Sequence, residues 1–518
     1  MPIINALKHH ATYRPEKIAI AFNNQTINYS TLYQRAENFR RALTTIKTKP
    51  NGKFGIPENG RLVLMILPNH HRFAEIFAGA SSSPNCVAVL SVETPLSQMR
   101  EIVRRLQPDL TICETENSDI ATIIRDEKLQ LLTLNHELGK HSSYDDFLTN
   151  TVSDYVDCDL PQAPFFIGFT SGTTGLPKAF IRTRESWRRS LEDGQSFFSL
   201  KPEQNVLAPG PMAHGVTLYA LVEALDCGQT FYGLDKFSVR RVTHYLTDID
   251  RFVGVPTMLP KLAEFAKANT MVFPRLAQLI TGASKFDTQH LSDARFLFPN
   301  AKIYQYYGAS ELSFIAVNEM TPESVDTGGI MSPVGKPFPR VAVTIRDNEG
   351  NVCPNGTIGT IYVDSALIAS GYLWGDNGES FVKTRHGATV GDLGMMDDRN
   401  NIFVMGRAGG MIISGGNNIY LAEIETALKK LAGIKEAVAL GLPDAIYGQR
   451  LVGIVEFSQN HDLSAKQLQQ LCLTVLERYK IPKDFFRIKT WPMTWSGKIA
   501  RAQLELMINQ HAKNIERL

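Results

Sequence analysis

The sequence lacks the features of membrane-spanning, secreted and nucleic-acid-binding proteins. Its 518 residues contain no apolar run of about 18 residues, the length that a membrane-crossing helix needs. The N-terminal stretch has neither a long apolar core nor a cleavage site, so we expect no signal peptide. Because the formal net charge is only +2 and no basic motif is present, nucleic acid is not an expected partner.

Cysteine is scarce, and no two cysteines are close in the sequence. The six cysteines are Cys86, Cys113, Cys158, Cys227, Cys353 and Cys472. Since none of them forms a C-x-x-C pair, the sequence predicts neither a zinc site nor a disulfide framework. Dispersed thiols are typical of a reducing cytosol, so we expect a cytoplasmic protein.

The length and the apolar pattern indicate an α/β protein with more than one domain. A chain of this length exceeds one ordinary hydrophobic core. Candidate strands at residues 61–67 and 87–90 are each followed by a candidate helix, at residues 73–79 and 96–106. This alternation predicts largely parallel sheets with helices between the strands.

The clearest predicted domain boundary lies near Arg407. Residues 1–406 are expected to form a large domain of α/β subdomains. A smaller β-subdomain is expected around residues 334–363, where glycine, proline and β-branched residues increase. Residues 407–518 are predicted to form a small, mobile α+β domain of ordinary domain size.

Two local signals predict helix starts. Residues 18–29 have the pattern of a β-hairpin, and Ser30 is placed to cap the helix after it. Ser464 and Gln467 form a capping-box pattern ahead of a helix whose apolar face extends to Tyr479.

A run of hydroxyl residues and glycines comes after an apolar stretch and precedes Lys178. It consists of Thr170, Ser171, Gly172, Thr173, Thr174 and Gly175. The glycines let the backbone fold tightly, so that N–H groups and hydroxyls can converge on one anion. Lys178 adds a positive charge on a flexible stem. The spacing differs from that of a P-loop, and the alternative for an isolated cluster of this kind is a surface loop.

The full string from Thr170 to Lys178 resembles the signature of the adenylate-forming superfamily, which includes acyl-CoA synthetases, nonribosomal adenylation domains and beetle luciferases. The resemblance covers about residues 10–505. It implies that the loop holds the β- and γ-phosphates of ATP while a carboxylate attacks the α-phosphate.

The segment that ends at Glu311 resembles a second motif of the superfamily, Y-G-x-T-E, with serine in place of threonine. Tyr307 is expected to stack on adenine, with Tyr306 as the alternative. The Ser310 hydroxyl is expected to bind a phosphate, and the Glu311 carboxylate is expected to hold Mg²⁺. The alternative is an aromatic core strand that ends in a turn.

An isolated histidine such as His214 is more often packed in a core or turned to solvent than functional. The resemblance makes His214 the gate of the carboxylate pocket. Amino-acid-activating members usually carry an aspartate shortly after this position, but residues 215–220 contain no acid. The sequence therefore favours a simple acyl or aryl carboxylate as the substrate.

The remaining motifs come in the order found in the superfamily. Asp392 matches the motif whose carboxylate accepts hydrogen bonds from the ribose hydroxyls, and Arg407 is expected to contact ribose or phosphate. Gly409 occupies a hinge position where the superfamily often has Asp or Lys. Gly415 and Gly416 match the loop that lines the thiol channel.

Lys498 lies in a segment that resembles the C-terminal P-x-T-x-S-G-K-I motif. By this resemblance it would stabilise the negative charge that develops as the pentavalent phosphorus forms. Arg184 stands where many members have histidine, and we expect it to alter contacts near the site.

The resemblance implies an AMP-forming acid–thiol ligase with Lys498, Lys178, His214 and Glu311 as the catalytic residues. Such an enzyme uses Mg·ATP to form an acyl-adenylate and then transfers the acyl group to coenzyme A, after the C-terminal domain rotates about Gly409. One alternative is a stand-alone adenylation enzyme that loads a carrier protein. Another is a nucleotide-binding regulator without catalysis.

The acid pocket is the least specified part of the prediction. By resemblance it draws on Tyr219, Gly282, Ala283, Ser284, Tyr306 and Gly308. Small residues at 282–284 are expected to leave room, and no charged partner for a second carboxylate is evident. The sequence therefore favours a medium-chain or aromatic acid.

Overall fold

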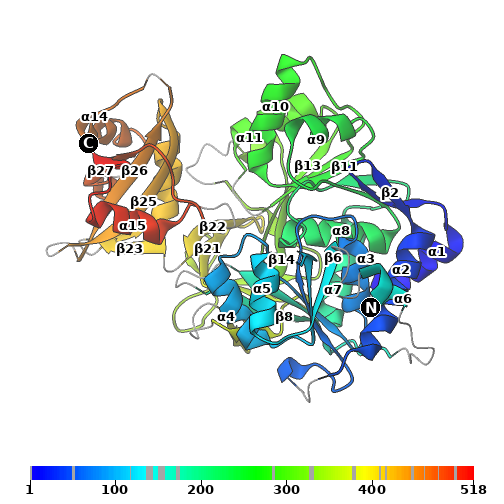
Figure 1. Ribbon diagram of the computed structural model, residues 1–518. Coiled ribbons are helices and arrows are strands. Elements are labelled where there is room, and N and C mark those ends of the chain that lie inside the picture. The colour runs from blue at the N-terminus through cyan, green and yellow to red at the C-terminus, as the bar shows by residue number, and fades with distance from the viewer. Residues whose placement is uncertain are drawn as a thin grey trace.

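A computed structural model gives the structure of most of the chain. It describes residues 3–48, 53–116, 118–135, 144–149, 158–170, 176–282, 286–325, 332–375, 381–407, 410–414, 417–444, 448–459, 461–476, 478–494 and 499–518. Figure 1 shows a large domain, blue to yellow, and a smaller C-terminal domain, orange to red, to one side of it.

The first large sheet has nine strands within the described residues, in the order β15, β14, β13, β12, β11, β9, β10, β1 and β2. In that order the strands are Lys336–Pro337, Ser313–Glu319, Lys302–Ala309, Gln278–Thr281, Arg251–Gly254, Asn205–Leu207, Thr230–Gly233, Ile18–Phe22 and Gln25–Asn28. The central strands run parallel. Antiparallel hairpins, β1–β2 and β13–β14, lie toward the two edges.

The second large sheet has seven described strands in the order β18, β8, β7, β4, β3, β5 and β6. In that order they are Gly371–Trp374, Lys178–Thr183, Pro164–Thr170, Cys86–Val89, Leu62–Ile66, Leu110–Thr115 and Leu131–Asn135. Strand β18 comes from much later in the chain and pairs antiparallel with β8. This pairing brings residues near 372 beside Lys178.

Helices cover both faces of each large sheet. Those of the large domain are α1 Ile3–Tyr13, α2 Tyr29–Ala42, α3 Phe73–Ala80, α4 Leu96–Leu106, α5 Asp119–Asp126, α6 Tyr144–Thr149, α7 Arg184–Phe197, α8 Gly215–Cys227, α9 Val239–Tyr245, α10 Leu259–Ala268, α11 Thr288–Leu297 and α12 Pro322–Val325. Helices α2, α3, α7 and α8 pack between the two sheets. Helices α4 and α5 cover the outer face of one sheet, and α9 to α11 cover the outer face of the other.

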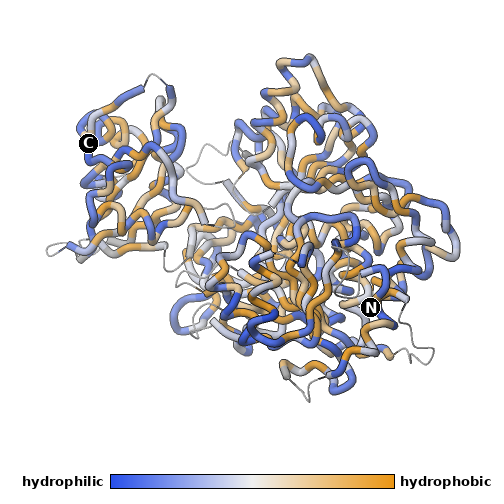
Figure 2. Tube along the Cα trace, viewed as in Figure 1, coloured by the Kyte–Doolittle hydropathy of each residue, from blue (hydrophilic) through white to orange (hydrophobic). Residues whose placement is uncertain are grey.

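The alternation of side chains along β3 explains these layers. Val63 and Met65 belong to the central core between the sheets, whereas Leu62, Leu64 and Ile66 belong to the outer core under α4. Because successive residues of a strand point to opposite faces, a continuous apolar run is needed where both faces are covered. Figure 2 shows the hydrophobic colour along the inner strands and the hydrophilic colour on outer loops.

A third sheet includes part of the range predicted for the β-subdomain, residues 334–363, and continues beyond it to Arg407. Its described strands are β16 Ala342–Arg346, β17 Gly359–Asp364, β19 Val382–Thr384, β20 Gly387–Thr389, β21 Asp392–Met396 and β22 Ile402–Arg407. It places Asp392 directly opposite Arg407 in the β21–β22 pair.

The C-terminal domain is a separate sheet with helices on both faces. Its described strands are β23 Met411–Ser414, β24 Asn417–Tyr420, β25 Ile434–Asp444, β26 Gly448–Phe457, β27 Asp484–Ile488 and β28 Ile515–Arg517. Helices α13 Leu421–Lys429 and α14 Ala465–Cys472 pack on one face, and α15 Arg501–Asn509 packs on the other. The domain thus has its own core, as the predicted α+β class requires.

Several local predictions are confirmed, and two need correction. The hairpin over residues 18–28 and the capping box of Ser464 and Gln467 are present. The first helix after the hairpin is capped by Asn28, whose Oδ1 accepts a hydrogen bond from the Thr31 N–H, rather than by Ser30. Helix α14 ends at Cys472, well before Tyr479, because the chain turns there to enter β27 beside β26.

No helix in the described part of the chain is both long and apolar enough to cross a membrane.

Candidate functional site

The carboxylate expected to hold the metal lies in the turn between β13 and β14. Glu311 is 5% exposed. The phenol of Tyr372 on β18 donates a hydrogen bond to its Oε1, and the Ala369 N–H donates to its backbone carbonyl at 2.8 Å. Residues that precede and begin β18 therefore fix a turn that belongs to the first large sheet.

Lys178 lies beside the same tyrosine. It begins β8 opposite Thr170 at the end of β7, and its Nζ is 5.5 Å from the centre of the Tyr372 ring. The structure therefore brings Lys178 and Glu311, which are far apart in sequence, to the same tyrosine. A cation and a carboxylate around one site suit a metal-bound polyphosphate.

The residues assigned to the nucleotide also meet. Tyr307, near the end of β13, donates its phenol hydrogen to Asp392 Oδ2 at 2.5 Å. Tyr307 is half-buried and Asp392 is buried. Since the Cα atoms of Asp392 and Arg407 are register partners, three motif positions from two sheets converge at one place.

Two residues expected to line the acid pocket pack against the same aromatic ring. Tyr219 of α8 and Tyr306 of β13 each lie edge-on to Phe314, with ring centres 5.2 and 5.0 Å away. Both tyrosines are half-buried in a region whose neighbours are buried. Burial raises the pKa of both phenols, so they are neutral hydrogen-bonding groups at pH 7.

Gly282 does not offer the room that the sequence suggested. A Cβ atom at this position would lie 2.4 Å from Cζ of Tyr306, so the tyrosine ring already fills the space above the glycine. Gly308 is also constrained by packing, because a Cβ there would lie 2.3 Å from the Ser313 carbonyl oxygen. Gly308 therefore has no room for a side chain, although its backbone is exposed.

His214 occupies the N-cap position of α8, where its carbonyl accepts the first helical hydrogen bond from the Leu218 N–H at 3.0 Å. Burial lowers the pKa of its half-buried imidazole, and the charge of Glu93 offsets part of that effect. The ring is therefore mainly uncharged at neutral pH, which suits a gate that must not trap the substrate carboxylate as an ion pair.

Sequence reasoning missed Asn69, which positions the loop before His214. Its side-chain amide donates to the carbonyls of Gly210 (2.9 Å) and Leu234 (2.8 Å), and its Oδ1 accepts from the Met212 N–H at 2.6 Å. Asn69 comes shortly after the apolar strand β3, so a polar residue at the end of a buried strand was the available signal. Tyr372 was missed as well, because nothing in its local sequence points to Glu311.

Arg184 packs away from Lys178. Its guanidinium is fully buried and donates to the carbonyls of Ala163 (3.1 Å), Pro164 (2.9 Å) and Asn85. These partners lie at the opposite end of β8 from Lys178. Arg184 therefore stabilises the packing of the second sheet rather than altering the site.

Some predicted site residues fall outside the described residues. They are Ser171, Gly172, Thr173, Thr174, Gly175, Ala283, Ser284, Gly409, Gly415, Gly416 and Lys498. Ser310 is described and lies in the exposed turn before Glu311. The roles of all the predicted site residues stay predictions.

Within the described residues no cluster of three or more His, Cys, Asp or Glu side chains could hold a metal ion. A single buried carboxylate with a fixed orientation, such as Glu311, nevertheless fits Mg²⁺. This ion keeps several waters and commonly binds through one or two carboxylates together with substrate phosphates.

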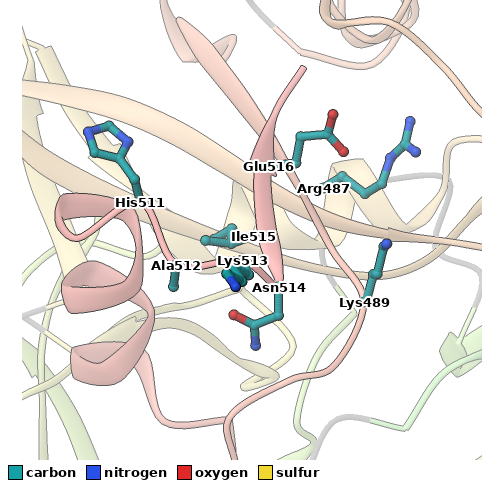
Figure 3. A pocket seen from close by; sticks show the side chains of 8 residues that line it. All are labelled: Arg487, Lys489, His511, Ala512, Lys513, Asn514, Ile515 and Glu516. Carbon is teal, nitrogen blue, oxygen red and sulfur yellow. The ribbon is translucent and has the colours of Figure 1, made fainter.

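A pocket in the C-terminal domain is separate from these residues. Figure 3 shows that it lies between the end of β27 and the segment that leads into β28. Its volume is about 240 Å³. Arg487, Lys489, His511 and Lys513 contribute to its lining, together with Glu516. None of the predicted site residues lines it.

Comparison with known proteins assigns both domains to the same enzyme family. The model of the AMP-binding enzyme family matches residues 7–373, and that of the AMP-binding enzyme C-terminal domain matches residues 423–498. An uncharacterized acyl-CoA ligase of Bacillus subtilis, YhfT, is 29% identical over 98% of this chain and 99% of its own length. A 2-succinylbenzoate–CoA ligase of Oceanobacillus iheyensis is 26% identical over 96% of this chain and 98% of its own length.

A solved structure shares the fold. The crystal structure of ATP-bound MatB from Rhodopseudomonas palustris superposes with a TM-score of 0.84 over 99% of this chain and 100% of that chain, at 20% identity. The family match spans both domains and includes Lys178, Glu311, Tyr307 and Tyr372. The chain therefore belongs to the AMP-binding enzyme family.

Proposed function

We propose that this chain activates a carboxylic acid with Mg·ATP to an acyl-adenylate and transfers the acyl group to coenzyme A. The observation that carries the proposal is the convergence of Lys178 and Glu311 on Tyr372, next to the contact between Tyr307 and Asp392. The names of the relatives, acyl-CoA ligase and 2-succinylbenzoate–CoA ligase, support the same reaction class.

In this proposal each half of the site has a separate task. Glu311 would hold Mg²⁺, which would supply charge neutralisation for the leaving pyrophosphate, and Lys178 would bind the same phosphates. Tyr307 would stack on adenine while Asp392 binds the ribose. The chemistry needs positioning and electrostatic stabilisation rather than covalent catalysis, and Lys498 would stabilise the charge that develops on the α-phosphate.

The proposed acid is medium-chain or aromatic. Tyr219 and Tyr306 both pack edge-on against Phe314, and such rings favour apolar or aromatic groups. A cytoplasmic location stays a prediction from the dispersed cysteines.

The test is AMP formation from ATP with a panel of short, medium, long-chain, aryl and amino acids, with and without coenzyme A. AMP that rises with medium-chain or aryl acids only when coenzyme A is present, together with a thioester identified by mass spectrometry, supports the proposal. Acid-dependent pyrophosphate exchange without coenzyme A turnover would instead indicate a carrier-protein thiol. Nucleotide binding with no reaction of any acid would indicate a regulator.

The role of Lys498 gives a prediction of its own. Lys498→Ala should lower acyl-adenylate formation by about 10²–10³-fold, because one donor to a developing charge is removed. Thioester formation from a supplied acyl-adenylate should change less than about threefold. Lys513→Ala is the matched control, since Lys513 is an exposed lysine of the same domain. Equal losses in both half-reactions would contradict the assigned role.

A further inference from the structure

Arg182 is a buried cation that neither the sequence motifs nor the proposed mechanism uses. It lies on β8, four positions after Lys178, and is 3% exposed. Burial lowers the pKa of its guanidinium to about 10, and the nearby Glu311 carboxylate partly offsets this effect. Arg182 is therefore still charged at neutral pH.

Its guanidinium forms hydrogen bonds to two segments that meet at Glu311. Nη2 donates to the Ser310 carbonyl at 2.6 Å, and Nη1 donates to the Leu367 carbonyl at 2.6 Å. Ser310 directly precedes Glu311, and Leu367 lies two residues before Ala369, whose N–H bonds the Glu311 carbonyl. Arg182 thus ties the turn before Glu311 to the chain segment that holds Glu311 in place.

No carboxylate in the described part of the chain forms an ion pair with Arg182. A buried charge is costly unless hydrogen bonds and a nearby opposite charge compensate it. Here two carbonyls accept the hydrogen bonds, and the negative charge of Glu311 favours the charged form of Arg182. The hydrogen bonds and the Glu311 charge that compensate the free-energy cost of burying Arg182 therefore lie at the turn that orients Glu311.

We propose that Arg182 is a positioning residue that fixes the Ser310–Glu311 turn so that the Glu311 carboxylate can bind a divalent metal with ATP. The inference rests on the proposed function of Glu311. Mg²⁺ demands near-ideal octahedral geometry. A carboxylate whose orientation varies because its turn is flexible therefore binds this ion poorly. Lysine at position 182 would keep the charge but lose the planar fork that reaches two carbonyls at once.

The experiment measures metal–nucleotide binding rather than turnover. Mn²⁺ replaces Mg²⁺, and electron paramagnetic resonance reports bound Mn²⁺ in the presence of ATP, while fluorescence titration reports metal-free AMP. Arg182→Lys should raise the dissociation constant of Mn·ATP about tenfold and change that of AMP less than about threefold.

Arg184→Lys is the matched control. Arg184 is also fully buried and also donates to several backbone carbonyls, but these belong to Ala163 and Pro164 rather than to the segments around Glu311. Both variants should lower the melting temperature, whereas only Arg182→Lys should weaken Mn·ATP binding selectively. Equal effects of the two variants on Mn·ATP binding would overturn the inference, as would equal losses of Mn·ATP and AMP binding in Arg182→Lys.

A second variant covers the case in which Arg182→Lys does not fold. Tyr372→Phe removes the phenol that donates to Glu311 Oε1 and leaves Arg182 intact. If orientation of Glu311 limits metal binding, this variant also weakens Mn·ATP binding without loss of AMP binding. Wild-type Mn·ATP binding in Tyr372→Phe would overturn the inference. Because no acid is present, a failure of the ligase proposal is detected separately, by the absence of acid-dependent AMP formation.

Discussion

Asn69 illustrates how one side chain fixes a loop that is distant in sequence. It makes three hydrogen bonds to residues 210–234, and these bonds hold the segment that leads to His214. An amide can do this because it donates two hydrogen bonds and accepts others at the same time. A residue of this kind supports a binding site without contacting the substrate itself.

We expect Asn69→Ala to weaken both the acid site and the fold. Each lost hydrogen bond costs about 1 kcal/mol, so urea unfolding should show a loss of about 2–3 kcal/mol. The KM for the acid should rise about tenfold because the loop before His214 is no longer held. Asn300→Ala, which removes one exposed hydrogen bond to the Pro274 carbonyl, is the control and should leave the KM unchanged.

The stacking role assigned to Tyr307 can be separated from its hydrogen bond to Asp392. Tyr307→Leu should raise the dissociation constant of ATP about tenfold, since stacking of a base on an aromatic ring contributes roughly 1–3 kcal/mol. Tyr307→Phe keeps the ring and should change it less than about threefold. Equilibrium titration with a fluorescent ATP analogue measures both. A large loss in the Phe variant would show that the bond to Asp392 matters more than stacking.

The residue-scale predictions from sequence identified segments that the structure brings together, but they did not identify the partners of those segments. Lys178, Glu311, Tyr307 and Asp392 could be found because each belongs to a motif with its own local pattern. Tyr372 could not, because its contact with Glu311 forms only when β18 pairs with β8. A hydrogen bond between distant segments leaves no local signal in the sequence.

At the scale of elements, the β13–β14 hairpin determines where Glu311, the proposed metal ligand, lies. The pairing shifts register between Tyr307 and Gly308, and Ser313, which begins β14, has a φ of +63°. Residues with positive φ are uncommon unless they are glycine, asparagine or aspartate. This tight connection presents Glu311 toward β18.

Gly308 should not tolerate a side chain. Gly308→Ala should destabilise the protein by about 1–3 kcal/mol, because the added methyl group would meet the Ser313 carbonyl oxygen at 2.3 Å. Gly215→Ala is the control, since a Cβ there meets nothing within 4 Å and the residue starts a helix. Chemical denaturation compares the two variants. Equal stability of both would contradict the crowding at Gly308.

The end of a helix depends in part on the position of the next strand, which the sequence pattern does not show. The apolar face after Ser464 extended past Cys472 in the sequence, but α14 stops there because the chain must return to form β27 parallel to β26. The cap at Asn28 rather than Ser30 has a local cause, since the helix begins directly at the end of the hairpin. Periodicity thus predicted the elements themselves better than their ends.

For the whole molecule, buried histidines should make stability fall in mild acid. Burial lowers the pKa of His70 to about 4 and also lowers the pKa values of His10, His71 and His214 from 6.5. Below about pH 6.5 these four histidines therefore bind more protons in the unfolded chain than in the folded one, and their contribution to folding stability decreases as the pH falls toward 4. Calorimetry should show a lower melting temperature at pH 5 than at pH 7.

His70→Asn tests the contribution of one histidine. Asparagine can keep an acceptor for the Arg72 N–H, which bonds Nδ1 of His70 at 3.1 Å, but it does not titrate. The fall in melting temperature between pH 7 and pH 5 should be smaller in this variant. His511→Asn, at an exposed position, is the control and should leave the fall unchanged. The same fall in both variants would contradict the assignment to His70.

The sequence by itself determined the fold class, the family and the order of the motifs, because runs of apolar residues and short motif strings act over a few neighbouring positions. It also indicated the two-domain organisation, since each part carries its own apolar periodicity. The tertiary structure decided which distant residues meet. The β8–β18 pairing brings Tyr372 to Lys178 and Glu311, and Tyr306 fills the space above Gly282. These contacts join segments that are distant in the chain, and only the pairing of strands and the packing of sheets determine them.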